Sequence, residues 1–166
     1  GWPDSLQLDY SNPSTAEAMT RELIQISGKC DGVRCDMAML VLPEVFEKTW
    51  GRKAHPFWSL AIKAVRKTKP DFCLMAEVYW DMEWILQQQG FDYAYDKRLY
   101  DRLYEGDPRA VREHFYANLD YQDKLARFLD KLVITQPRNE NEARRRHPAE
   151  AQRQAPRDRH GDSFIT

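Results

Sequence analysis

Two carboxylates stand at the ends of two short apolar runs, and their placement could support nucleophilic and acid–base chemistry. Asp36 ends the stretch Asp31-Gly-Val-Arg-Cys-Asp36, and Glu77 ends the stretch Phe72-Cys-Leu-Met-Ala-Glu77. If the two runs are neighbouring strands about 4.8 Å apart, the two carboxyl groups could stand about 5–5.5 Å apart. At that spacing one carboxylate can attack a sugar while the other transfers the proton.

The neighbours of each carboxylate suit a different role, and each carboxylate lies in an apolar stretch of sequence. Arg34 lies two residues before Asp36, on the same side of the strand, where a guanidinium would keep Asp36 ionised as a nucleophile. Glu77 is followed closely by Tyr79 and Trp80, an apolar and aromatic setting that favours the protonated form a general acid needs. Both rings could also stack on a sugar. The alternative is a pair of buried salt bridges without catalytic purpose, because structural ion pairs also place charges at such positions.

Alternating strands and helices must position these residues. Strands separated by helical segments favour βαβ units and therefore a parallel α/β sheet. Functional side chains of such sheets lie at the carboxyl ends of the strands, so Tyr95 and Asp96, which end a third run, are also of interest. The patterns predict helices over residues 14–28, 56–69, 81–90, 96–104 and 108–130, the last with a break near Asn118, and strands near residues 31–36, 72–78 and 91–95.

Length and composition limit the class of protein. The chain has 166 residues, a net charge of -1 and 42% hydrophobic residues, which suits one domain with a core. The longest apolar run, residues 37–42, is far shorter than the roughly 18 residues of a membrane span, and no basic and apolar leader precedes it. Three cysteines without zinc-ligand spacing favour reduced thiols and a cytoplasmic protein. The histidines are scattered, and the sequence has neither a clustered acidic loop nor a glycine-rich phosphate loop. We therefore expect no metal and no other cofactor.

The chain divides by composition into a body, residues 1–136, and a tail, residues 137–166. Residues 137–160 contain seven Arg and four acidic residues but no Lys and no aromatic residue. This segment cannot bury enough apolar surface to offset its chain entropy, so we expect a disordered basic tail of low complexity. Nucleic-acid binding is not expected, because the aromatic side chains that stack on bases are missing, and neither is a membrane partner.

Three segments resemble the signature regions of the alpha-amylase superfamily, glycoside hydrolase family thirteen. Residues 31–38 resemble the second region, with its pattern of Gly, an apolar residue, Arg, any residue and Asp. Residues 74–80 resemble the third region, an apolar strand that ends in the acid/base Glu, and residues 6–13 resemble a short extra region. Residues 90–96 look like the sixth strand of that barrel. The resemblance covers roughly residues 2–129 and implies a partial (β/α)8 TIM barrel with parallel strands and flanking helices, corresponding to strands four to six.

The resemblance also implies residue roles and an activity. By its motifs Asp36 is the nucleophile, Glu77 is the general acid/base and Arg34 orients Asp36. Asp9, together with the two aromatic residues that follow Glu77, would bind substrate. The implied function is that of a retaining alpha-glycosidase or transglycosylase in carbohydrate metabolism, acting on oligo- or polysaccharides of the alpha-glucan type.

The sequence departs from the family pattern in ways that concern activity. Met39 and Leu40 stand where family members often carry a Lys-His pair that contacts sugar, and the Asn-His-Asp region expected after Leu129 is missing. A full barrel takes about 250 residues, so we expect open sheet edges, possible self-association through them and negligible activity of the isolated chain. The change of composition near Leu129 indicates a frameshifted or mispredicted gene end, with a natural divergent tail as the alternative. The alternative function is a catalytically inactive amylase-like homologue or a truncated interaction fragment.

Overall fold

The computed structural model describes residues 6–128, which fall within one unit of the chain, Gly1–Leu129. The predicted tail lies outside the described residues. Among those described, no helix is both long and apolar enough to cross a membrane. The elements in chain order are α1 (Pro13–Ser27), β1 (Gly32–Cys35), the 3-10 helix η1 (Ala38–Val41), α2 (Pro43–Trp50), α3 (Trp58–Thr68), β2 (Cys73–Ala76), α4 (Glu83–Gln89), β3 (Tyr93–Tyr95), α5 (Lys97–Glu105), α6 (Pro108–His114), α7 (Leu119–Gln122) and β4 (Leu125–Ala126).

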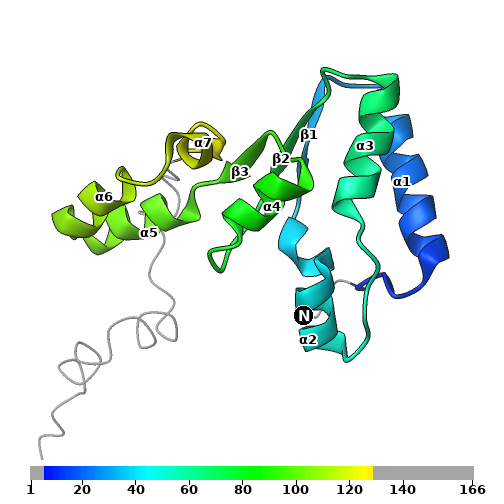
Figure 1. The fold of residues 1–166 in the computed structure, drawn as a ribbon, viewed down its shortest axis with the longest axis horizontal. Coiled ribbons are helices and arrows are strands. Elements are labelled where there is room, and N and C mark those ends of the chain that lie inside the picture. The colour runs from blue at the N-terminus through cyan, green and yellow to red at the C-terminus, as the bar shows by residue number, and fades with distance from the viewer. Residues whose placement is uncertain (1–5, 129–166) are drawn as a thin grey trace, which may run out of the picture. The chain divides into compact units, whose positions relative to one another are not determined.

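The described strands form one parallel sheet in the order β1-β2-β3-β4. Helices occupy the connections between consecutive strands, so the predicted α/β arrangement of βαβ units is confirmed. Figure 1 shows α1 and α3 side by side, in agreement with the contacts between these two helices.

The prediction of one helical segment over 108–130 with a break near residue 118 is wrong at its carboxyl-terminal end. The helices α6 and α7 do lie on either side of Asn118, which caps α7 by accepting a hydrogen bond from the Asp120 amide. The chain then leaves the helical conformation, and Leu125 and Ala126 pair with Ala94 and Tyr95 as the fourth strand.

The two faces of the sheet differ in burial. Side chains on one face are fully buried against the helices, as Leu74, Ala76 and Ala94 show. The alternate positions, which include Arg34 and Tyr93, stay partly or largely exposed, because successive side chains of a strand point to opposite faces. This open face continues to the carboxyl ends of the strands, where the predicted site residues lie.

The buried face packs on a core built largely from α3 and the segments that flank the strands. The core includes Ala61, Ile62 and Val65 of α3 together with Phe72 and Phe91. The contact of α3 with the sheet region is fixed further by Trp58, whose indole Nε1 donates a hydrogen bond to the Ala38 carbonyl oxygen at 2.7 Å. The first turn after β1 is therefore anchored to the core.

Candidate active site

Asp36 and Glu77 occupy equivalent places on neighbouring strands. Each follows the last residue of its strand, and Cys35 pairs with Ala76 in the parallel register of β1 and β2. The Glu77 amide donates to the Cys35 carbonyl oxygen at 3.0 Å, which extends the pairing by one residue. The two carboxylates therefore lie at the same edge of the sheet.

One guanidinium contacts both carboxylates. Nη1 of Arg34 donates to Oδ1 of Asp36, as expected, and Nη2 of Arg34 lies 2.8 Å from Oε1 of Glu77. Because two charge-assisted contacts radiate from one planar group, the positions of the two carboxylates are coupled.

The surroundings of the two carboxylates differ in exposure. The Glu77 side chain is 10% exposed, whereas that of Asp36 is 72% exposed, so the apolar setting expected for Asp36 is not found. The reason is local: Met37 takes a left-handed conformation with φ 44°, and the chain turns Ala38 and Met39 into the core while Asp36 remains on the open face.

The electrostatics favour an ionised Asp36. A hydrogen bond with the Glu77 carboxyl group and then one with Arg34 lower the pKa of Asp36 below its ordinary value. Both effects stabilise the charged form of this carboxylate.

Glu77 is held by two further donors. Its Oε2 accepts a hydrogen bond from the Met37 amide at 2.9 Å, and its Oε1 accepts one from the Tyr79 hydroxyl at 2.8 Å. Burial, followed by the hydrogen bond to Glu77, raises the pKa of Tyr79 to about 12, so the phenol remains a donor at neutral pH. The Tyr79 hydroxyl, predicted to serve the substrate, is thus directed at the carboxylate.

Tyr95 is a site residue to which sequence reasoning gave no role. Nε of Arg34 donates to the Tyr95 hydroxyl oxygen at 3.0 Å. The Tyr95 ring in turn packs on Phe128, with ring centroids 4.9 Å apart. The only signal in the sequence was that Tyr95 ends the third apolar run, since the contact joins residues that are 61 positions apart.

Asp96 also lies at the carboxyl end of a strand, but its interactions are structural. Its side chain is 1% exposed; it caps α5 by accepting from the Leu99 amide at 3.0 Å and contacts His114 Nε2 at 2.9 Å. Nε of Arg127 lies 3.4 Å away. The carboxylate therefore ties α5, α6 and the end of β4 together.

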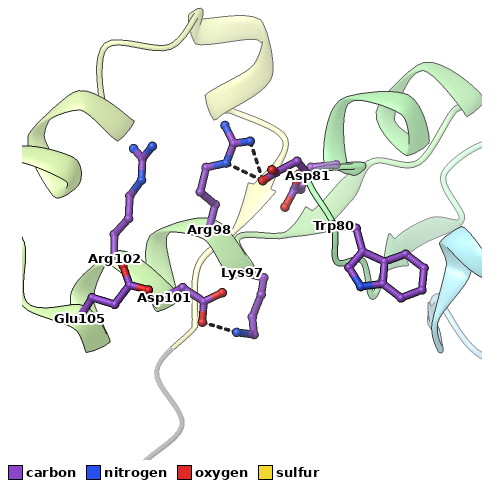
Figure 2. A pocket seen from close by; sticks show the side chains of 8 residues that line it. Trp80, Asp81, Lys97, Arg98, Asp101, Arg102 and Glu105 are labelled. Atoms are coloured by element: carbon purple, nitrogen blue, oxygen red, sulfur yellow. Dashed lines mark hydrogen bonds and ion pairs between the residues drawn. The ribbon is translucent and has the colours of Figure 1, made fainter. Parts of the chain in front are cut away.

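The remaining predicted residues lie apart from the carboxylate pair. The Asp9 carboxylate pairs with Nη1 of Arg52 at 2.7 Å and accepts hydrogen bonds from Ser11. Trp80 is 61% exposed on the wall of a cavity that reaches α5 (Figure 2). The structure thus brings together the predicted Arg34, Asp36, Glu77 and Tyr79, adds Tyr95, and leaves Asp9 and Trp80 outside this cluster.

The parallel four-stranded sheet with its flanking helices has the arrangement of part of a (β/α)8 barrel. No protein-family model matches the chain, and no curated protein matches it. The solved structure titled "Crystal structure of an alpha-amylase from Lactobacillus plantarum" is similar, with a TM-score of 0.51 and 25% sequence identity over 75% of this chain. The match covers 30% of that amylase chain. The chain therefore has an amylase-like fold and spans about a third of the length of the solved amylase.

Proposed function

We propose that this chain carries the nucleophile and the general acid/base of a retaining alpha-glycosidase or transglycosylase that acts on alpha-glucan-type carbohydrates. The observation that carries the proposal is the shared guanidinium: Arg34 binds Asp36 and Glu77 at the same edge of the sheet. The similarity to an alpha-amylase structure supports the class of substrate.

The proposed reaction has two steps. In the first, the ionised Asp36 carboxylate attacks the anomeric carbon, the glycosidic C–O bond breaks, and the Glu77 carboxyl gives its proton to the leaving oxygen. A glycosyl ester on Asp36 results. In the second step Glu77 takes a proton from water or from an acceptor hydroxyl, whose oxygen attacks the anomeric carbon and releases Asp36. Two inversions leave the configuration retained.

The closeness of the two carboxylates supports retention over inversion. An inverting pair must stand about 6.5–9.5 Å apart, with room for a water molecule beside the sugar. Here both carboxylates contact the same guanidinium of Arg34, which favours the shorter separation of a retaining pair. Arg34 would orient and charge Asp36, while Tyr79 and Tyr95 would position the acid/base and the guanidinium.

The alternative, an inactive amylase-like homologue or interaction fragment, rests on the exposure of Asp36. A side chain that is 72% exposed lacks the water-excluded surroundings in which electrostatic stabilisation of a transition state is strong. The alternative does not account for the three groups that contact the carboxylate pair, namely the Arg34 guanidinium, the Met37 amide and the Tyr79 hydroxyl, so we favour the catalytic role.

The test compares two variants on two substrates. At high enzyme concentration, Asp36→Asn should abolish release from both an activated aryl alpha-glucoside and an unactivated alpha-glucan. Glu77→Gln should lower release from the unactivated substrate by about 10²–10⁴-fold, the usual contribution of a general acid, and affect the activated one far less.

Asp31→Asn is the matched control for these variants. Asp31 is fully exposed, lies at the opposite end of β1 and pairs with Lys69 at 2.9 Å. Its substitution should leave both rates unchanged. Because the chain spans only about a third of the solved amylase, release by wild type should itself be slow. Wild-type release that does not exceed the Asp36→Asn level even at high enzyme concentration would contradict the proposed function.

A further inference from the structure

The turn after β2 leads from the carboxylate pair to α4. Val78 is fully buried, and the next residue, Tyr79, donates from its hydroxyl to Oε1 of Glu77 at 2.8 Å. Trp80 and Asp81 complete the turn, which closes with a long hydrogen bond of 3.4 Å from the next amide to the Tyr79 carbonyl oxygen. The direction of the Tyr79 hydroxyl therefore depends on how firmly this turn is held.

The backbone of this turn has an unfavourable conformation. Trp80 and Asp81 have φ values of 62° and 59°, in the left-handed region that bulky side chains rarely adopt. Strained conformations of this kind persist only where the surrounding structure enforces them. Packing contributes little here, because both side chains are exposed and border a cavity of about 540 Å³. The turn therefore needs a contact from another element.

Arg98 of α5 supplies such a contact. Its Nε donates to Oδ1 of Asp81 at 2.8 Å and its Nη2 lies 2.5 Å from the same oxygen, as Figure 2 shows. The helix that carries Arg98 is itself fixed, since Asp96 caps it and its next residues, Leu99 and Tyr100, are buried. The turn after β2 is thus tied to the helix that follows β3.

We propose that Arg98 is a positioning residue: by binding Asp81 it fixes the turn after β2 and keeps the Tyr79 hydroxyl on Glu77. Arg98 acts through the turn and not on the substrate. In the reaction it would hold the Glu77 carboxyl in one orientation, as proton transfer to the leaving oxygen requires. This consequence rests on the proposed function, whereas the hold on the turn can be measured without turnover.

The test is a fluorine-19 NMR titration of the full chain labelled with 3-fluorotyrosine, in which Tyr79→Phe assigns the signal. Fluorine makes a phenol more acidic, so the titration needs less alkaline solutions. Burial, followed by the hydrogen bond to Glu77, raises the pKa of Tyr79 to about 12. In Arg98→Met and in Asp81→Ala the pKa of Tyr79 should fall by about one unit, half of the way to its ordinary 10.0.

This fall would report a moved turn and not the lost charge of Arg98. The titratable groups that act on the phenol of Tyr79 are Glu77, Arg34 and Tyr95, and all three are kept in these variants. Arg98→Lys, which keeps the charge but not the planar fork, should give an intermediate pKa of Tyr79.

Arg102→Met is the matched control. Arg102 lies one turn further along α5 and lines the same cavity, but its Nη1 donates to the Ala110 carbonyl oxygen at 2.8 Å. This variant should keep the wild-type pKa of Tyr79. Tyr10 of the core should titrate at the same pH in every variant, because a partly exposed ion pair adds little to global stability.

Sugar release gives a second readout. Arg98→Met should lower release from the unactivated alpha-glucan about tenfold and from the activated aryl alpha-glucoside by less than about twofold, because only the former needs the acid. An unchanged pKa of Tyr79 in both Arg98→Met and Asp81→Ala, or full glucan release by Arg98→Met, would overturn the inference even where cleavage depends on Asp36. A lowered pKa of Tyr79 in a chain without Asp36-dependent cleavage would uphold the hold on the turn and reject the catalytic proposal.

Discussion

Replacing Asp96 with Ala should destabilise the fold far more than removing an ordinary helix cap. The change removes the acceptor for the Leu99 amide, a loss of about 0.5–2 kcal/mol for a helix N-cap. It also leaves His114, which is 4% exposed, without its carboxylate partner at 2.9 Å, at a cost of about 1–3 kcal/mol for a buried unsatisfied group. The free energy of unfolding should therefore fall by about 1.5–5 kcal/mol.

The matched control is Asp107→Ala. Asp107 caps α6 by accepting from the Arg109 amide at 2.9 Å but is exposed, so its loss should cost only about 1 kcal/mol. Urea unfolding followed by tryptophan fluorescence measures both variants. If the two variants lose the same stability, the buried pair contributes nothing and Asp96 is not the structural residue described above, which would reopen a functional role for this third carboxylate at the edge of the sheet.

Three further predictions concern the site and the strands that position it. A hydrogen bond with Glu77, and after it the hydrogen bond with Arg34, lowers the pKa of Asp36. Arg34→Met should therefore raise the pKa of Asp36 in a carbon-13 NMR titration, and an unchanged pKa would contradict the contact between Arg34 and Asp36. Burial raises the pKa of Glu83 above its ordinary 4.5, so the stability that the protonated side chain contributes is fully present below pH 4.5 and is lost as pH rises through the raised pKa. Glu83→Gln should therefore make the urea midpoint fall less with rising pH and should be more stable than wild type at neutral pH. An unaltered pH dependence of the urea midpoint would refute this prediction. A Cβ at Gly32 would stand 2.7 Å from a carbonyl oxygen of β2. Gly32→Ala should therefore lower the free energy of unfolding in urea by about 1–3 kcal/mol. If this variant were as stable as wild type, the strands could separate freely and the close approach would not matter.

The strands that carry the carboxylates could be predicted because their signals are local. The apolar runs before Asp36 and Glu77 have the length of strands, and helix signals separate them. The helix boundaries were less accurate: α1 begins at Pro13, one residue before the predicted start, with Asn12 as its cap, and α3 begins at Trp58, two residues after the predicted start. Such shifts arise because several residues near a helix end can satisfy the same backbone groups.

The fourth strand and the exposure of Asp36 could not be predicted, for different reasons. Leu125 and Ala126 form a strand only through pairing with Ala94 and Tyr95, some thirty residues earlier, and two residues are too few to show alternation. Asp36 is followed by apolar residues, but the left-handed turn at Met37 sends them to the other side of the sheet. A neighbour in sequence is thus a poor guide to the surroundings of a side chain next to a turn.

The contacts that complete the site are equally non-local. Arg34 meets Glu77 and Tyr95 only because three strands lie in parallel register, which brings their carboxyl ends to one edge. The sequence indicates that edge, but the choice of hydrogen-bond partners there depends on side-chain directions that only the packed sheet defines. The pairing of Asp9 with Arg52, for example, has no signal in either segment.

Covalent trapping on Asp36 tests the central claim most directly. An alpha-glucosyl fluoride with a second fluorine on the ring needs no acid for its leaving group, and it forms the glycosyl ester faster than the ester is hydrolysed. Intact mass spectrometry after incubation should show a single adduct of the fluorinated glucosyl group, and fragmentation of the tryptic peptide 35–48 should place it on Asp36. The adduct should be absent from Asp36→Asn and present in Asp31→Asn. An unlabelled wild-type chain, or a label that persists in Asp36→Asn, would contradict the assignment of Asp36 as the nucleophile.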